Sequence, residues 1–348
     1  MLTVILDLNK NFETQYKMER RNMKGLSTGP VAGALDVGTS FPYTNLPDSN
    51  NRETDPEKEQ NPNTKWLRDA KWGVFTHFLP HMASRPIPIM NREQWNKKVN
   101  SFDVKKLGDQ LSALKAPYFF ITIGQAGMYY CSPNKAFDKF FGADKGSRTE
   151  RDLIADIAAE LVPRGIRMCV YSASYGAGGP PEEQKMWLEV FTEWSERWGK
   201  SISAWWLDGG KKVSFPTYQA YFNALKAGNK DALVATKLWS ALSNDQILED
   251  YVGGESGFLL AVSDKHHNQY REGFSEKIPL HFLTFLGEFW GIGEPRFPVE
   301  VVTGWTQHIN NMGGTVSWDC PLTDSGKIPD KVYEQLAVLS KRINNDVS

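Results

Sequence analysis

Short hydrophobic runs alternate with amphipathic stretches along most of this chain, from Lys65 onward. The runs are almost wholly apolar, which is typical of strands buried on both faces of a parallel sheet. The pattern predicts eight strands, over residues 72–77, 118–124, 168–171, 204–210, 232–236, 258–262, 281–285 and 315–319.

Apolar residues recur at helical spacing between these runs. Segment 151–161 places its leucines and isoleucines on one face, and segment 182–198 carries a tryptophan-rich stripe that we interpret as core. A helix near the end of the chain contains Val332, Leu336 and Leu339. Strand–helix alternation repeated about eight times predicts an α/β fold, a (β/α)8 TIM-like barrel or a distorted relative of it. The alternative is a doubly wound open sheet, but GxGxxG and P-loop motifs are absent.

The first 64 residues have a different composition. From Gly29 to Thr64 the chain is rich in Gly, Pro, Asn, Asp and Glu, which cannot bury enough apolar surface to fold alone. We therefore predict a flexible or loosely packed N-terminal extension over residues 1–64 and a barrel over residues 65–348. Residues 1–8 make a poor signal peptide, because the apolar run is short and is interrupted by Asp7. A cytoplasmic protein and an exported one whose upstream signal was removed are both compatible with this start.

Composition excludes several classes of function. The 348 residues carry 40 Lys+Arg and 41 Asp+Glu, so no basic stripe for nucleic acid is expected. No apolar run reaches the roughly 18 residues that a membrane span needs. Cys131, Cys169 and Cys320 are too few and too widely spaced for a disulfide framework or a cysteine metal site. The many aromatic residues indicate a well-filled core, with stacking against sugar rings as the second interpretation.

Polar residues stand where the predicted strands end, which is where α/β barrels carry their catalytic groups. They are His77, Gln125, Asp208, Glu255, Glu288 and Asp319. Asp208 is the most informative, because it ends an apolar strand and precedes Gly209 and Gly210, which let the chain turn away and leave the carboxylate open. A helix N-cap is the alternative role for this aspartate.

Hydrolysis of a glycoside with retention needs a second carboxyl group beside the nucleophile. Glu255 is the first candidate and lies among glycines in segment 250–257, which we predict to be an exposed loop; Glu288 competes for the same role. A metal site is not expected, because His266 and His267 are adjacent and diverge, and no HExxH occurs. A serine hydrolase is disfavoured by the absence of a GxSxG elbow.

Several sequence blocks occur in one fixed order. They read WLRDAKWGVFTH at 66–77, RDL at 151–153, GIRMCVYS at 165–172, WLDGG at 206–210, DYVGGE at 250–255, WG at 290–291 and PLTDSGKIP at 321–329. In this order they resemble the catalytic domain of glycoside hydrolase family 29, the retaining exo-α-L-fucosidases. The resemblance covers residues 65–345 and implies a barrel, here without the C-terminal β-sandwich usual in the family.

The resemblance implies roles for particular residues. Asp208 matches the family's nucleophile, and Glu255 matches a glutamate that serves as acid/base in several members. We expect His77 and Gln125 to bind sugar hydroxyls, and Trp206, Trp290 and Trp318 to line the pocket. No metal or organic cofactor is implied, and the expected partner is an oligosaccharide or glycoconjugate substrate.

One block departs from the family pattern. Where the family has T-x-K-H-H-D-G-F, this chain has TIGQAGMY at 122–129, so Gln125 and Ala126 replace the two sugar-binding histidines. Loss of such donors changes sugar discrimination by orders of magnitude. We therefore predict cleavage of a terminal α-linked sugar, fucose or a related one. A catalytically inactive carbohydrate-binding barrel is the alternative, and elimination or transfer on the same scaffold is a third possibility.

Overall fold

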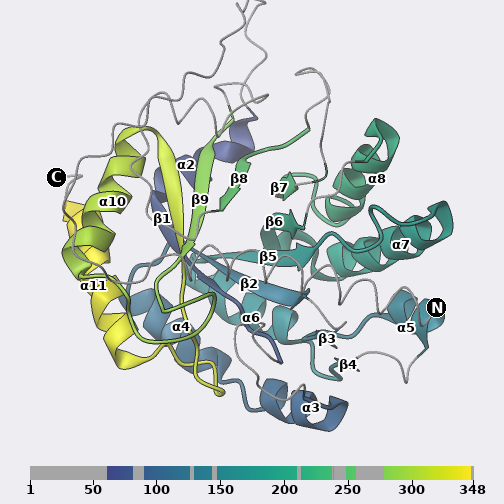
Figure 1. Cartoon of the computed structure of the whole chain (residues 1–348), viewed down its shortest axis with the longest axis horizontal. Helices are drawn as coiled ribbons and strands as arrows, with labels where there is room; N and C mark the ends of the chain where they lie inside the picture. Colours follow the sequence, from purple (N-terminus) through teal and green to yellow (C-terminus); the bar gives the residue numbers. More distant parts are fainter. Residues whose placement is uncertain are drawn as a thin grey trace, which may run out of the picture. The chain divides into compact units, whose positions relative to one another are not determined.

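Eight parallel strands form a nearly closed barrel with helices between them, which confirms the predicted (β/α)8 TIM-like fold (Figure 1). The computed structural model describes residues 61–80, 90–125, 129–142, 147–209, 213–236, 238, 248–255 and 278–345. The barrel strands are β1 (Trp72–Thr76), β2 (Tyr118–Gln125), β5 (Arg167–Ala173), β6 (Ile202–Asp208), β7 (Leu233–Thr236), β8 (Val252–Glu255), β9 (Leu280–Phe285) and β10 (Gly314–Asp319). Their lateral order is β7-β6-β5-β2-β1-β10-β9-β8.

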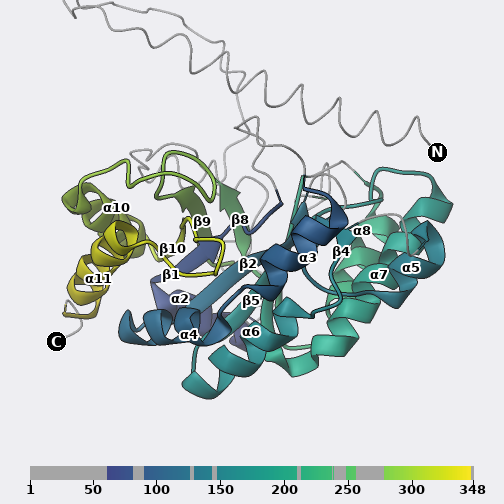
Figure 2. The ribbon, with the colours of Figure 1, turned by 90° about the horizontal axis from the view of Figure 1, so that it is seen from below.

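Helices surround the strands, with α10 and α11 packed side by side in one part of this layer and α7 and α8 in another (Figure 2). The helices are α2 (Lys65–Ala70), α3 (Arg92–Asn100), α4 (Val104–Ala113), α5 (Lys135–Phe141), α6 (Leu153–Leu161), α7 (Pro181–Trp198), α8 (Phe215–Leu225), α10 (Val299–Asn311) and α11 (Asp330–Asn345). The short strands β3 (Tyr129–Tyr130) and β4 (Ser147–Arg148) extend the sheet beyond β2. Side-chain caps begin several helices; Asp103, for example, accepts a hydrogen bond from Lys106 N at the start of α4.

Strand residues alternate between two hydrophobic layers, as the period of a strand requires. On β6, Trp206 belongs to the cluster that fills the barrel, whereas Trp205 belongs to the layer between strands and helices. Leu67 and Ala70 of α2 join the inner cluster. Because α2 directly precedes the start of β1, it closes the amino-terminal end of the barrel. The carboxyl-terminal end is therefore the place for an accessible site.

β7 and β8 are the one neighbouring pair without a described strand ladder, and buried carboxylates bridge the seam. Asp250 N donates to the Val234 carbonyl at 3.0 Å, and Val234 N donates back to Asp250 Oδ2 at 2.9 Å. Thr236 N donates to Glu249 Oε2 at 2.7 Å. The two carboxylates thus accept the backbone N–H groups that the carbonyls of a paired strand would otherwise accept.

The structure confirms seven of the eight predicted strands, and the eighth prediction, 258–262, lies outside the described residues. The exposed loop predicted over 250–257 is wrong where the structure describes it, since Val252–Glu255 is strand β8, paired with β9. Its glycines serve close packing. A Cβ atom on Gly253 would lie 3.3 Å from the Trp206 ring, and one on Gly254 would lie 2.5 Å from the His281 carbonyl oxygen.

The predicted N-terminal extension falls almost entirely on residues 1–60, outside the described residues. Residues Pro62–Thr64 form a short 3-10 helix, and Asn61 Nδ2 donates to Asp250 Oδ1 at 2.6 Å. None of the helices in the described ranges is long and apolar enough to cross a membrane. All three cysteines are buried free thiols.

Candidate active site

Asp208 is the last residue of β6 and faces the barrel interior, because it has the same parity on the strand as Ala204 and Trp206. Trp206 lies one layer below it, fully buried against Phe75 and Tyr171. Asp208 itself is partly exposed. The partly exposed carboxylate thus lies above aromatic side chains at the carboxyl-terminal end of the barrel.

Tyr171 of β5 is the partner of this carboxylate. Its hydroxyl donates to Asp208 Oδ2 at 2.6 Å and accepts a 3.3 Å hydrogen bond from Gln125 Nε2. Burial raises the pKa of Tyr171 well above its usual value, and the negative charges of Asp208 and Glu255 add to the effect. The phenol therefore keeps its proton at neutral pH and remains a hydrogen-bond donor to Asp208.

Glu255 ends β8 and is partly exposed. Two residues earlier Gly253 packs against the Trp206 ring inside the barrel, so the same parity directs Glu255 inward. The charge of Glu255 also acts on the pKa of Tyr171. Two carboxylates from β6 and β8 thus act on one buried phenol. Glu288, the rival candidate, lies in the exposed turn that follows β9.

His77 directly follows β1, and its ring contacts two aromatic residues of the barrel mouth. The ring centroids of Tyr171 and Trp290 each lie 5.4 Å from that of His77. Trp290 is partly exposed and packs edge-on against Phe285 at the end of β9, with 4.7 Å between ring centroids. The structure thus brings His77 and Trp290 together with the Tyr171–Asp208 pair.

Trp318 does not belong to this group, and its predicted place in the pocket lining is wrong. Its side chain is fully buried on the outer face of β10, where Nε1 donates to Thr306 Oγ1 of α10 at 3.1 Å and the ring packs on Trp305. The physical reason is strand parity: Asp319, the next residue, faces inward. Asp319 Oδ1 accepts a hydrogen bond from the His77 backbone N–H at 3.0 Å, and Oδ2 lies 3.0 Å from His77 Nδ1.

Two site residues were not assigned a role from sequence. Tyr171 lies within an apolar strand, and its one sequence signal is a hydroxyl near the carboxyl end of that strand. Asp319 stands at a strand end, and the sequence gives it no function. In both residues the role depends on a partner distant in sequence: Asp208 of β6 for Tyr171, and His77, just after β1, for Asp319.

Gln125 is held by the strand that returns from the end of β2. Gln125 pairs with Tyr129 of β3 in antiparallel register, and Cys131 N donates to the Ile123 carbonyl at 2.9 Å. Trp95 Nε1 of α3 donates to the Tyr130 carbonyl at 2.9 Å. These bonds fix the backbone on both sides of the Gln125 position.

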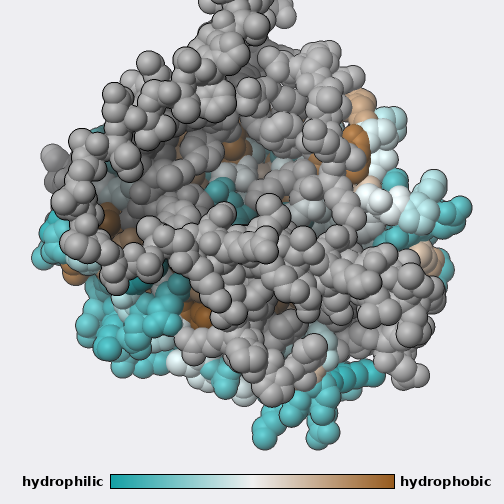
Figure 3. Space-filling view, in the orientation of Figure 1, coloured by the Kyte–Doolittle hydropathy of each residue, from teal (hydrophilic) through white to brown (hydrophobic). Residues whose placement is uncertain are grey.

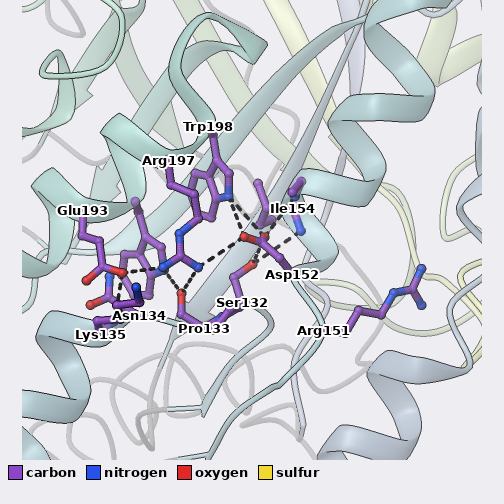
Figure 4. A network of polar contacts seen from close by, with 12 residues as sticks. Ser132, Pro133, Asn134, Lys135, Arg151, Asp152, Ile154, Glu193, Arg197 and Trp198 are labelled. Atoms are coloured by element: carbon purple, nitrogen blue, oxygen red, sulfur yellow. Dashed lines mark hydrogen bonds and ion pairs between the residues drawn. The ribbon is translucent and has the colours of Figure 1, made fainter.

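A polar network outside the barrel anchors the chain beyond this return strand (Figure 4). Ser132 Oγ donates to Asp152 Oδ1 at 2.8 Å, and the same carboxylate accepts Trp198 Nε1 at 3.1 Å. Arg197 donates to the Pro133 carbonyl at 2.9 Å. Asp152 also caps α6. The network therefore ties the segment after Gln125 to α6 and α7, and its role is structural.

The described residues that are visible near the centre of the view in Figure 3 include both hydrophilic and hydrophobic ones. Such a mixture suits a sugar, whose ring faces are apolar and whose rim is polar. Among the residues that the structure describes, no group of three or more His, Cys, Asp or Glu could hold a metal ion. His266 and His267 lie outside the described residues.

No protein-family model and no curated protein matches this chain. Solved structures do match. The unliganded α-L-fucosidase AlfC from Lactobacillus casei aligns with a TM-score of 0.60 and 16% identity over 82% of this chain and 98% of that enzyme. A substituted AlfC in complex with 4-nitrophenyl α-L-fucopyranoside aligns with a TM-score of 0.61 and 14% identity, over 82% and 100% of the two chains.

The endo-fucoidan hydrolase MfFcnA4 of glycoside hydrolase family 107 aligns with a TM-score of 0.62 and 15% identity over 83% of this chain. The alignment covers 54% of that hydrolase, so this chain spans about half of its length. The TM-scores of 0.60 to 0.62 establish a shared fold, whereas membership of glycoside hydrolase family 29 stays a prediction at identities of 14–16%. The chain has the barrel fold of an α-L-fucosidase and of an endo-fucoidan hydrolase.

Proposed function

We propose that this protein is a retaining glycoside hydrolase that cleaves a terminal α-linked sugar, fucose or a related one, through a covalent intermediate on Asp208. One observation carries the proposal: Asp208 lies at the carboxyl-terminal end of the barrel with Tyr171 donating to it at 2.6 Å, and Glu255 acts on the same phenol. A glycoside hydrolase that retains the anomeric configuration needs two carboxyl groups in its site, and two inward-facing ones end these strands. The shared fold with an α-L-fucosidase and an endo-fucoidan hydrolase supports the same sugar class.

The proposed reaction has two steps. In the first, an Asp208 oxygen attacks the anomeric carbon, the bond to the leaving oxygen breaks, and Glu255 gives that oxygen its proton. In the second, Glu255 removes a proton from water, the water oxygen attacks the anomeric carbon, and the Asp208 ester bond breaks. The Tyr171 hydrogen bond favours the ionised nucleophile before each turnover.

The residues around Asp208 and Glu255 would recognise the sugar. His77 and Gln125 supply polar groups for sugar hydroxyls, and Trp290 offers a partly exposed aromatic face for the apolar side of the ring. Trp206 is fully buried beneath Asp208 and packs against Tyr171. Since Gln125 and Ala126 stand where family 29 has two histidines, we expect a preference among fucose-like sugars that differs from that of the family.

The replaced histidine pair also favours a second candidate, a barrel that binds the sugar without cleaving it. In that protein, Asp208 and Glu255 would bind hydroxyl groups. Calorimetric binding of a monosaccharide, together with no turnover of any glycoside, would support this candidate.

The test is a panel of 4-nitrophenyl α-glycosides assayed with the wild type, Asp208→Ala and Asp208→Gly. Asp324→Ala is the matched control, because Asp324 is an exposed carboxylate. We expect the wild type to cleave the fucoside or a close analogue, the Asp208 variants to lose at least about a thousandfold in kcat/KM, and the control to be unchanged. Full turnover by Asp208→Ala would refute the mechanism.

A further inference from the structure

Asp319 is the last residue of β10, and its buried carboxylate joins two parts of the site. Oδ1 accepts the His77 backbone N–H at 3.0 Å, and Oδ2 is 3.0 Å from His77 Nδ1. Oδ2 also accepts the backbone N–H of Gly291 at 2.7 Å. The side chain of Asp319 is fully buried, so water does not compete for these bonds. One carboxylate therefore binds the end of β1 and the loop that carries Trp290.

The contact with Nδ1 determines which nitrogen of His77 carries the proton. An ionised carboxylate only accepts hydrogen bonds, so Nδ1 must be the donor. Nε2 has no hydrogen-bond partner in the described part of the chain, and it is not one of the fully buried unpartnered atoms. In the neutral ring, Nε2 is thus an acceptor that keeps some solvent contact on a side chain that is 6% exposed, and it is suited to a hydroxyl group of a sugar.

The contact with Gly291 holds Trp290 against this ring. Gly291 has a φ of +64°, and a Cβ atom there would lie 2.7 Å from the His77 carbonyl oxygen, so the loop packs directly on His77. Asp319 fixes the Gly291 amide from the other side. The aromatic face of Trp290 and the acceptor nitrogen of His77 consequently have a fixed relative position.

We propose that Asp319 is a positioning residue for sugar recognition, which acts by fixing the Nδ1–H form of His77 and the place of Trp290. The proposal rests on the proposed function, because it assigns the sugar to the same barrel mouth. It adds a specific chemical requirement: the sugar must present a hydroxyl donor to His77 Nε2 while its apolar face lies on Trp290.

Asp319→Asn tests this role with little change in volume. An asparagine has one acceptor oxygen, so its NH2 group must face either the His77 backbone N–H or the pair of donors at Oδ2. The barrel should survive, because β1 and β10 remain joined by their ladder and by the Thr76 Oγ1 bond to the Cys320 carbonyl at 2.9 Å. Asp324→Asn, at an exposed carboxylate, is the control.

The first readout needs no turnover. Nitrogen-15 NMR of the imidazole rings, with His77→Gln to assign the signal, should show the neutral His77 ring protonated on Nδ1 in the wild type. The signal should change in Asp319→Asn and stay the same in Asp324→Asn. Protonation of the neutral wild-type ring on Nε2 would overturn the proposal, even if Asp319→Asn failed to fold.

The second readout is a double-mutant cycle on kcat/KM. We expect Asp319→Asn to lower kcat/KM by about tenfold or more in the wild-type background, a size typical when the group that orients a histidine is removed. In the His77→Gln background, Asp319→Asn should lower kcat/KM by less than about threefold, because the imidazole ring that Asp319 orients is absent. An equal factor in both backgrounds, or no loss in either, would overturn the proposal.

These readouts separate two kinds of failure. If the wild type cleaves no glycoside, the proposed function fails, and the cycle is then measured on sugar affinity by calorimetry while the NMR result still decides the positioning role. If the wild type is active and its neutral His77 carries the proton on Nε2, the positioning role fails and the proposed function stands.

Discussion

The hydroxyl of Tyr171 donates a 2.6 Å hydrogen bond to Oδ2 of Asp208 across the β5–β6 pair. A length of this kind is typical of an O–H donor to an ionised carboxylate. Because Tyr171 is buried and holds its proton, the bond is directional and fixes one oxygen of Asp208. In the proposed mechanism, the oxygen that attacks the sugar is the other one, Oδ1.

Replacing Tyr171 with phenylalanine should reduce kcat/KM by about ten- to a hundredfold, because Asp208 loses a preorganised donor. Steady-state kinetics on the best aryl glycoside measures this. The control is Tyr221→Phe, which removes a buried tyrosine hydroxyl bonded to the Tyr175 carbonyl at 2.8 Å, away from Asp208. Equal losses in both variants would show that the effect is one of stability.

Glu255→Gln should slow cleavage according to the leaving group. We expect a loss of about a hundredfold or more for alkyl or sugar leaving groups, which need protonation, and a smaller loss in the first step for nitrophenol, which leaves readily. Glu288→Gln, in the exposed turn after β9, is the matched control and should retain wild-type rates. The reverse result would assign the acid/base role to Glu288.

The buried seam between β7 and β8 should make stability depend on pH. Burial raises the pKa of Glu249 to about 8 from its usual 4.5, with the Asp250 charge adding to the effect. Between these values the folded state binds more protons than the unfolded state, so the free energy of unfolding falls as pH rises through this window.

The variant Glu249→Gln removes this titration and keeps an acceptor for Thr236. Urea unfolding at several pH values should show a decline in stability from pH 6.5 to 8 in the wild type that is weaker in the variant. His281, whose pKa burial lowers to about 3 from 6.5, changes stability mainly below this range, and it does so equally in both proteins. Identical slopes in the two proteins would contradict the assignment.

The two glycines of β8 should tolerate alanine differently. A Cβ on Gly254 would lie 2.5 Å from the His281 carbonyl oxygen, a rigid backbone atom, whereas one on Gly253 meets the Trp206 ring at 3.3 Å. We expect Gly254→Ala to lower the free energy of unfolding by about 1–3 kcal/mol, and Gly253→Ala to cost less. Thermal and urea unfolding measure both, and equal stability of the two variants would be inconsistent with the packing described.

The sequence predicts the barrel well because its strands are continuous apolar runs, a local signal. Asp208 is also local, since it ends such a run before glycines. Strand β8 escaped prediction because Val252–Glu255 has no apolar pattern, and its glycines make room for Trp206 on a distant strand. Trp318 was misplaced although parity with Asp319 could have shown that it faces outward.

The side-chain contacts between distant strands could not be predicted from the sequence. Tyr171 and Asp208 are 37 residues apart, and His77 and Asp319 are 242 residues apart. Nothing in the local pattern indicates that such residues meet. The closure of the barrel determines these contacts, and with them the hydrogen bonds that orient the candidate nucleophile and the candidate sugar-binding histidine.

The most direct test of the central claim is a covalent trap. Incubation with 2-deoxy-2-fluoro-α-L-fucosyl fluoride, or the matching reagent for the preferred sugar, releases fluoride and should leave one fluorosugar on the protein by intact mass. Peptide mapping should place it on Asp208, and Asp208→Ala should remain unlabelled. Label on a different residue, or turnover of glycosides with inverted product configuration, would contradict a glycosyl–Asp208 intermediate.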